Sequence, residues 1–267
     1  MSNIFDGILL VSDIDGTFAG SDKVFNKENL KSVKYFTDNG GLFTFATGRF
    51  EKNEKMLEIK DHMNAPAICA NGASLYDFQT ETLIYKQGID GELLKDKLYD
   101  IQEKYNCLKL RYTYEDAFVY LIKRREKIFT YDWYKAVIED TDNTGTNLDK
   151  FRKDIEKTCG DIYYYSKSEP HLFEILDKTA TKGTMLTKLR EHLDAKYNKK
   201  FKIYAIGDYE NDIPMLEVAD VAVCPENALP MVKAVRGIRT VRHHNRGAVA
   251  DLIRIIEEDV KKEIKHG

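Results

Sequence analysis

Short, uninterrupted apolar runs are the feature that most constrains the fold of this chain. In the first part of the sequence they occur at 8–13, 42–47 and 67–70, and aspartate, glycine or asparagine marks the end of each. Such runs are typical of strands that are buried on both faces of a parallel sheet. Between the first two runs, Asn26 can cap a helix over residues 27–38. The alternation of strand and helix predicts a right-handed parallel α/β sheet.

The same rhythm returns near the C-terminus, but the middle of the chain has a different pattern. Residues 202–208 and 220–224 have the character of buried strands, and residues 247–265 that of a long amphipathic helix. Before them, residues 108–123 and 161–176 alternate apolar with polar positions, are rich in aromatic side chains, and each contain a break typical of a hairpin turn. This alternation predicts an antiparallel sheet with one covered face.

Together these patterns predict an α/β domain that is interrupted by a smaller insertion. The α/β domain is expected to be doubly wound, with a mostly parallel sheet, and to consist of residues 1–85 and 179–267. An inserted α+β domain is expected at residues 86–178. A chain of 267 residues is long enough to build a core for each.

The composition of the chain indicates which partners it can bind and in which compartment it works. The net charge of -3 gives no general attraction to nucleic acid or to an anionic membrane surface, so neither is expected as a partner. No apolar stretch approaches the roughly 20 residues that a transmembrane helix needs. The four cysteines form no CxxC pair, which is typical of free thiols in a reducing compartment. We therefore expect a cytoplasmic protein.

Polar residues follow each predicted parallel strand. The carboxyl ends of parallel strands meet at one edge of a sheet, where α/β proteins bind their ligands, so these residues are expected to converge. Whether the Asn71-Gly72 pair is a simple turn or lies near the substrate is left open, and Arg49 is expected to fix the loop after Thr47. The residues at the strand ends are Asp13, Asp15, Thr47, Gly48, Arg49, Asn71, Gly72, Gly207, Asp208, Asn211 and Asp212.

Four of these residues are aspartates, and their mutual repulsion points to a bound cation. Two carboxylates 4 Å apart repel by roughly 4 kcal/mol at an effective dielectric constant of about 20. Oxygen ligands without histidine or cysteine favour Mg²⁺, and a bound Mg²⁺ suits a phosphate group. Thr47 can donate a hydroxyl proton to such a phosphate, and Lys182, before Gly183, is well placed to add a fixed positive charge.

The motifs DIDGT at 13–17 and GDYEND at 207–212, with Thr47 and Lys182 between them, resemble those of the haloacid dehalogenase superfamily. The order of the motifs and the large insertion after Asn71-Gly72 resemble its Cof-type sugar-phosphate phosphatase branch. The resemblance covers essentially the whole chain. It implies a Mg²⁺-dependent phosphatase that acts on small phosphorylated metabolites, with the insertion as a cap that closes over the active site.

The resemblance also implies a role for each motif residue. Asp13 would be the nucleophile that forms an aspartyl phosphate, and Asp15 the general acid and base. Thr47, with the adjacent Gly48, and Lys182 would hold the phosphoryl group. The metal would be bound by Asp13, Asp208 and the backbone carbonyl of Asp15. Asp212 would support the metal directly or through water, and Asn211 would contact the phosphate or the lysine.

Two other functions stay open from the sequence. A phosphomutase uses the same residues but returns the phosphoryl group to a sugar. A non-catalytic regulatory module would keep the fold and lose catalytic residues, yet none of those implied by the resemblance is missing. A monomer or a weak homodimer is expected.

Overall fold

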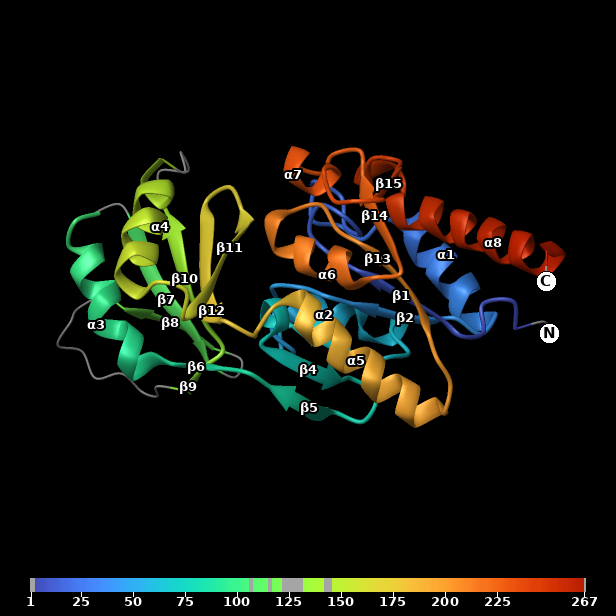
Figure 1. Ribbon diagram of the computed structural model, residues 1–267, viewed down its shortest axis with the longest axis horizontal. Helices are drawn as coiled ribbons and strands as arrows, with labels where there is room; N and C mark the ends of the chain where they lie inside the picture. Colours follow the sequence, from blue (N-terminus) through green and yellow to red (C-terminus); the bar gives the residue numbers. More distant parts are fainter. Residues whose placement is uncertain (1–2, 106–107, 115–116, 122–131, 142–145, 267) are drawn as a thin grey trace.

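The apolar runs at the two ends of the chain form one five-stranded parallel sheet (Figure 1). The computed structural model describes residues 3–105, 108–114, 117–121, 132–141 and 146–266. In spatial order the strands of this sheet are β15 (Arg239–Val241), β14 (Val221–Pro225), β13 (Lys202–Ile206), β1 (Ile8–Ser12) and β2 (Leu42–Phe45). Strand β1, which precedes Asp13, therefore lies between β13, which precedes Asp208, and β2, which precedes Thr47.

Helices cover both faces of this sheet, as a doubly wound fold requires. Leu10 of β1 packs into a cluster with α1 and α8, whereas its neighbours Leu9 and Val11 point to the other face, into a cluster with α5 and α6. As expected for a strand that is apolar on both faces, β1 lies inside the sheet, between β13 and β2. The helices and short turns of this part are α1 (Lys27–Asp38), α2 (Glu54–Ile59), η1 (Lys60–His62), α5 (Lys182–Tyr197), η3 (Glu210–Asp212), α6 (Ile213–Val218), α7 (Pro230–Lys233), η4 (His244–Arg246) and α8 (Ala248–His266).

The third apolar run is linked to the main sheet by an isolated parallel bridge between Ala46 and Ile68. It forms β3 (Ala67–Cys69), followed by η2 (Ala70–Gly72) and by the antiparallel strands β4 (Ser74–Asp77) and β5 (Thr82–Lys86). These last two strands were not expected from the sequence. The predicted helix at 27–38 is confirmed, and the side chain of Asn26 accepts hydrogen bonds from the first turn.

The middle of the chain forms a second, antiparallel sheet in the order β11-β12-β10-β7-β8. Its two outer hairpins are the ones predicted from the alternating segments. The remaining elements are β6 (Ile89–Asp90), α3 (Gly91–Gln102), β7 (Leu108–Tyr114), β8 (Ala117–Leu121), β9 (Asp132–Trp133), β10 (Lys135–Asp140), α4 (Thr146–Cys159), β11 (Tyr163–Glu169) and β12 (Leu172–Asp177).

One face of this second sheet is covered by α3 and α4, as the alternation predicts. Ile138 of β10 and Phe173 of β12 are buried there in one cluster with Leu98 and Phe151 of the two helices. The alternate positions, which include Lys135 and Glu174, point to the opposite face, toward the parallel-sheet part. An α/β fold with an inserted α+β part is thereby confirmed, while the exact boundaries at residues 85 and 179 stay a prediction.

Polar contacts between side chains join the inserted part to the rest of the chain. Lys23 pairs with Glu169 at 2.9 Å, and Arg152 of α4 pairs with Glu210 of η3 at 2.8 Å. The hydroxyl of Tyr134 donates to a carboxylate oxygen of Glu51 at 2.8 Å. These contacts hold the inserted sheet against the carboxyl edge of the parallel sheet.

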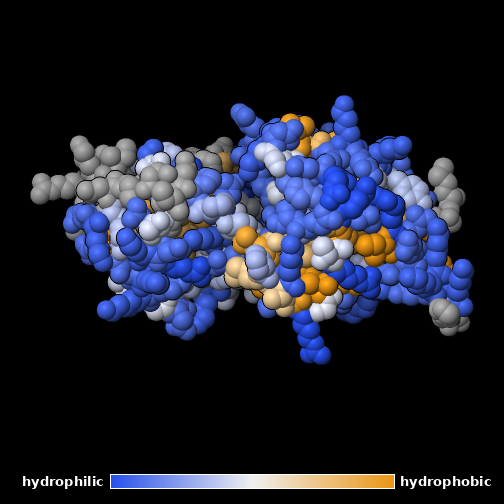
Figure 2. All heavy atoms as spheres, turned by 90° about the horizontal axis from the view of Figure 1, so that it is seen from above, coloured by the Kyte–Doolittle hydropathy of each residue, from blue (hydrophilic) through white to orange (hydrophobic). Residues whose placement is uncertain are grey.

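The surface seen in Figure 2 is mostly hydrophilic, and its hydrophobic side chains gather over the parallel-sheet part. Of the helices in the described part of the chain, none combines the length and the apolar character that crossing a bilayer requires.

Candidate active site

The site is built on the loop that leaves β1. The backbone N–H of Asp13 still donates to the carbonyl of Ile206, at 2.9 Å, so Asp13 sits at the edge of the sheet beside the end of β13. The chain then turns at Gly16, whose φ of +85° is accessible to glycine at little cost. A Cβ atom at this position would also overlap the carboxylate of Asp208. The glycine of the DIDGT motif therefore lets the loop pass close to the second acidic strand end.

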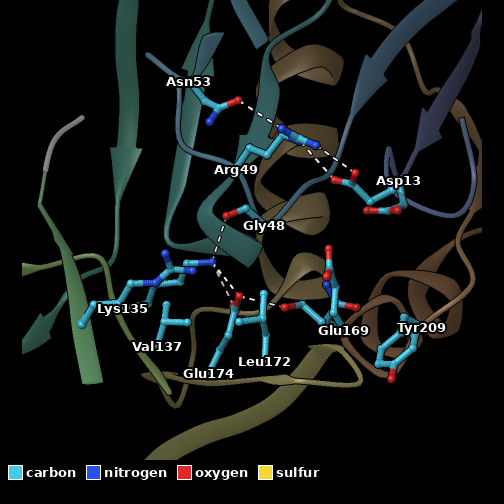
Figure 3. A pocket seen from close by; sticks show the side chains of 14 residues that line it. Asp13, Gly48, Arg49, Asn53, Lys135, Val137, Glu169, Leu172, Glu174 and Tyr209 are labelled. Atoms are coloured by element: carbon cyan, nitrogen blue, oxygen red, sulfur yellow. Dashed lines mark hydrogen bonds and ion pairs between the residues drawn. The ribbon is translucent and has the colours of Figure 1, made fainter. Parts of the chain in front are cut away.

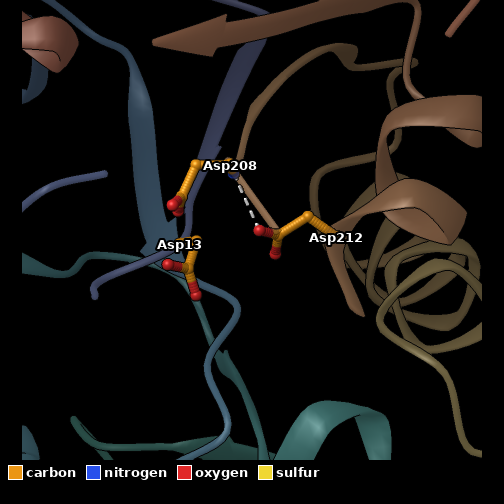
Figure 4. Close-up of side chains that lie close together, drawn as sticks. All are labelled: Asp13, Asp208 and Asp212. Atoms are coloured by element: carbon orange, nitrogen blue, oxygen red, sulfur yellow. Dashed lines mark hydrogen bonds between the residues drawn. The ribbon is translucent and has the colours of Figure 1, made fainter. Parts of the chain in front are cut away.

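Three aspartates from two strand ends come together at this edge (Figure 4). Asp13, Asp208 and Asp212 each offer a carboxylate oxygen, and these oxygens lie within 4.8 Å of one another. Asp208 is held by the hydroxyl of Thr17, which donates to its Oδ1 at 2.8 Å. Asp212 is held by the backbone N–H groups of Asp208 and Tyr209, which donate to its Oδ2 at 2.9 and 3.0 Å.

Lys182 lies among these carboxylates at the first position of α5. Its Nζ donates to Oδ1 of Asp13 at 2.7 Å and to Oδ1 of Asp212 at 2.6 Å. Its side chain is fully buried. The preceding Thr181 caps α5 in a capping box with Thr184, which fixes where the helix begins and so where the lysine points.

The electrostatics of the group follow from burial and from crowding of like charges. Burial raises the pKa of Asp13 well above its ordinary value of 3.8, and Lys182 offsets only part of this effect. Burial, and then the charge of Asp212, raises the pKa of Asp208 to about 7. Burial alone would lower the pKa of Lys182, but Asp13 and Asp212 hold it well above 10.5. One ammonium thus faces three carboxylates, and a further cation would stabilise their ionised forms.

The donor set fits Mg²⁺. All candidate ligands of the group are carboxylate oxygens, and neither histidine nor cysteine belongs to it. Hard oxygen donors at a charged, partly hydrated edge are what Mg²⁺ selects. Repulsion among the gathered carboxylates adds to the effect of burial on the pKa values of Asp13 and Asp208, and a bound cation would relieve it.

The side chain of Asp15 lies outside this group. Arg49 binds it through two nitrogens, Nε at 3.0 Å and Nη2 at 2.8 Å, and Lys23 approaches it at 3.2 Å. Burial by itself would raise the pKa of Asp15, but the hydrogen bond and charge of Arg49, together with Lys23, lower it below 3.8. Arg49 was expected to fix the loop after Thr47. It also binds the carboxylate of Asp15 in the DIDGT motif, so that expectation is incomplete.

The predicted phosphate-binding residues form a second group beside Asp13. Thr47 is buried, and its Oγ1 accepts the N–H of Arg49 at 3.2 Å. Asn211 donates from Nδ2 to Oδ1 of Asn71 at 2.9 Å. Asn71 has a left-handed backbone, with φ of 58°, and its amide donates to the carboxylate of Glu174. Asn71, left open as turn or site residue, thus takes part in the network beside the site.

A pocket of about 220 Å³ opens between the parallel edge and the inserted sheet (Figure 3). Of the predicted residues, Asp13, Asp15, Gly48 and Asn211 line it, whereas the buried Thr47, Lys182, Asp208 and Asp212 are not among its lining residues. The inserted part contributes seven lining residues: Arg111, Lys135, Val137, Ser168, Glu169, Leu172 and Glu174.

Sequence reasoning missed these last residues. The signal that could have found two of them is a single charge within an apolar strand: Lys135 in YKAVI and Glu174 in LFEIL. Such a charge is rarely buried unless it is paired. Both side chains are about 4% exposed, and they pair with each other at 2.9 Å.

The profile of the haloacid dehalogenase-like hydrolases matches residues 10–253. The chain belongs to this family. The family and its Cof-type branch, predicted from the DIDGT and GDYEND motifs, are confirmed, and so is the enzyme class of hydrolase.

Two of the proteins with similar sequences are named as phosphatases. A 5-amino-6-(5-phospho-D-ribitylamino)uracil phosphatase of Bacillus subtilis is 29% identical over 83% of this chain and 88% of its own length. A phosphoglycolate phosphatase of Thermoplasma volcanium is 25% identical over 84% of this chain and 88% of its own.

Solved structures share the fold over nearly the whole chain. A HAD/COF-like hydrolase from Plasmodium vivax superposes with a TM-score of 0.78 at 19% identity, covering 95% of this chain and 96% of its own. A protein from Thermotoga maritima superposes with a TM-score of 0.71 at 23% identity, covering 93% and 97%.

Proposed function

We propose that this protein hydrolyses small phosphomonoesters with Mg²⁺, through a phosphoryl group carried transiently on Asp13. The observation that carries the proposal is the convergence of Asp208, Asp212 and Lys182 on Asp13, which itself lines a pocket. The phosphatase names of the relatives support the same reaction.

Asp13 is the proposed nucleophile because its carboxylate lines the pocket while one oxygen is fixed. Lys182 donates to Oδ1, and no described residue donates to Oδ2, which is therefore the oxygen that attacks phosphorus. The attack forms the Oδ2–P bond and breaks the bond between phosphorus and the leaving oxygen. Lys182 stabilises the ionised form of Asp13 and offsets part of the effect of burial, and a bound cation would add to this.

Asp15 is the proposed acid and base, two residues further along the loop. In the arrangement with Arg49 it is an ionised acceptor, which suits the second half of the reaction, when a base must take a proton from the attacking water. The first half needs a proton on Asp15 for the leaving oxygen. Donation therefore requires that the Arg49 contact loosen when substrate enters.

The phosphoryl oxygens are proposed to contact Thr47, the backbone at Gly48, Asn211 and Lys182. Thr47 and Asn211 supply neutral donors, and Lys182 supplies charge. When bound by Asp13, Asp208, the carbonyl of Asp15 and Asp212 (directly or through water), Mg²⁺ supplies further positive charge against the phosphoryl group.

The substrate is proposed to be a small phosphorylated metabolite, with sugar phosphates as the leading class. Of the fourteen residues that line the pocket, Tyr209 is the one aromatic, and charged and amide side chains prevail. Hydroxyl-rich leaving groups match such a lining better than flat aromatic bases do. A cytoplasmic location and a monomeric or weakly dimeric state stay predictions from the sequence.

Phosphate release from a panel of sugar phosphates, nucleotides and cofactor phosphates, with Mg²⁺, tests the function. Release from several small esters that Asp13→Asn abolishes is the expected result. No release from any of them would revive the non-catalytic alternative. A hexose bisphosphate in the same panel separates a mutase, which would return an isomerised monophosphate, from a hydrolase.

A further inference from the structure

Lys135 and Glu174 form a buried ion pair that the proposed chemistry does not use. They lie on the pocket face of the inserted sheet, on neighbouring strands β10 and β12, and each is 3% exposed. Nζ of Lys135 donates to both carboxylate oxygens of Glu174 at 2.9 Å. Desolvation of two charges costs about as much as their attraction returns, so apolar residues would stabilise the fold as well or better. The pair therefore has to be explained by what else it touches.

Each member of the pair also binds a segment of the parallel-sheet part, and Figure 3 shows the contact of Lys135 with Gly48. Nζ of Lys135 donates to the carbonyl oxygen of Gly48 at 2.8 Å. Glu174 accepts from the side-chain amide of Asn71, and from the hydroxyl of Ser168 at 2.9 Å. The contacts of the pair thus reach two of the strand-end loops that border the pocket.

The contact with Gly48 fixes one peptide plane in the phosphate-binding loop. The carbonyl of Gly48 and the N–H of Arg49 belong to the same planar peptide. While Lys135 holds the carbonyl, the N–H points to Oγ1 of Thr47, which it reaches at 3.2 Å. Thr47 then accepts from its own loop, and its hydroxyl hydrogen has no acceptor among the residues that the structure describes. That hydrogen is left for a phosphoryl oxygen.

We propose that Lys135, held by Glu174, is a positioning residue of the inserted domain that aligns the Gly48–Arg49 peptide and, through it, the Thr47 hydroxyl for phosphate binding. The inference rests on the proposed function. It means that the inserted sheet completes the phosphate site itself, in addition to shaping the space for the leaving group.

The double variant Lys135→Met/Glu174→Gln separates positioning from simple stability. Lys135→Met alone would leave Glu174 buried without its cation. The double variant removes both charges, and the glutamine side chain can accept from Asn71 with its oxygen and donate to the hydroxyl oxygen of Ser168 with its NH2 group. Gly48, however, loses its donor. Tyr134→Phe is the matched control, because it removes the neighbouring contact from the inserted part to Glu51 and leaves Gly48 untouched.

Three measurements are made on the full-length protein: urea unfolding, kcat/KM with p-nitrophenyl phosphate and with acetyl phosphate, and hydrogen–deuterium exchange of residues 47–53. The double variant should unfold like the wild type, exchange faster at 47–53, and lose about a hundredfold in kcat/KM, the scale expected for a displaced binding group. The loss should be equal for both leaving groups. Tyr134→Phe should keep the wild-type activity and the wild-type exchange of the Arg49 amide, since the contact that it removes is to the side chain of Glu51.

Wild-type kcat/KM in the double variant would overturn the proposal, and so would a loss that differs widely between the two leaving groups, since Lys135 would then contact substrate. If the wild type hydrolyses neither compound, the proposed function fails by itself. Exchange at 47–53 then decides the inference, and an unchanged rate in the double variant refutes it.

Discussion

Replacing Asp208 by asparagine should make the metal-free protein more stable, and the gain should grow with pH. Asp208 is 8% exposed, and burial and the charge of Asp212 raise its pKa from 3.8 to about 7. Between these values the folded protein keeps the proton that the unfolded chain has lost, so the free energy of unfolding falls as pH rises. Asparagine cannot ionise, and its side-chain oxygen can still accept the hydrogen bond from Thr17.

The size of the effect follows from the shift. A difference of about three pKa units at 1.36 kcal/mol per unit corresponds to about 4 kcal/mol. Asp208→Asn should therefore exceed the wild type by less than about 2 kcal/mol at about pH 5 and by up to about 4 kcal/mol at about pH 8. The larger figure is an upper value, because Asp13 and Asp212 titrate in the same group and share the repulsion.

Urea unfolding in EDTA, followed by circular dichroism across this pH range, measures the difference. Mg²⁺ at a thousandfold its Kd should remove the gain, since it adds about 4.1 kcal/mol to the wild type and little to the variant. Asp61→Asn, at an exposed aspartate of η1, is the control and should show neither effect. A gain for Asp208→Asn that does not change with pH would refute the clustering of charges inferred here.

Three further outcomes are expected. Asp15→Asn should still accept a phosphoryl group from acetyl phosphate but release it at least about a hundredfold more slowly, as mass spectrometry of quenched protein would show; wild-type release would exclude Asp15 as the base. Gly207→Ala should lose most activity, because its Cβ would overlap the carboxylate of Asp212, and unchanged kcat/KM would contradict that packing. EDTA should abolish turnover and Mg²⁺ restore it; turnover indifferent to EDTA would count against the metal.

The part of the site that lies at strand ends could be predicted from the sequence. Apolar runs mark the strands, and parallel strands all present their carboxyl ends at one edge, so the position of Asp13 or Asp208 in the chain already implies its place in space. The same apolar runs predicted that strands and helices alternate along residues 8–47 and 202–224, as they do in the structure. Strands β4 and β5 were missed because each is short and pairs antiparallel within a region that otherwise alternates strand and helix.

The contribution of the inserted sheet could not be predicted in the same way. Lys135 and Glu174 are 39 residues apart, and they meet because β10 pairs with β12 in one particular register, with Val137 opposite Glu174. A shift of either strand by one residue would turn its charged side chain to the helix-covered face. The two hydrogen bonds from Arg49 to Asp15 likewise depend on the geometry of their loops, which no spacing in the sequence specifies.

The central claim is that a phosphoryl group passes through Asp13, and trapping that intermediate tests it most directly. Wild-type protein with Mg²⁺ and acetyl phosphate would be quenched in acid within a turnover, reduced with borohydride and digested for peptide mass spectrometry. The account predicts that residue 13, and neither Asp15 nor Asp208, is converted to homoserine. Turnover that leaves residue 13 unmodified, with the reduced residue found elsewhere or nowhere, would contradict it.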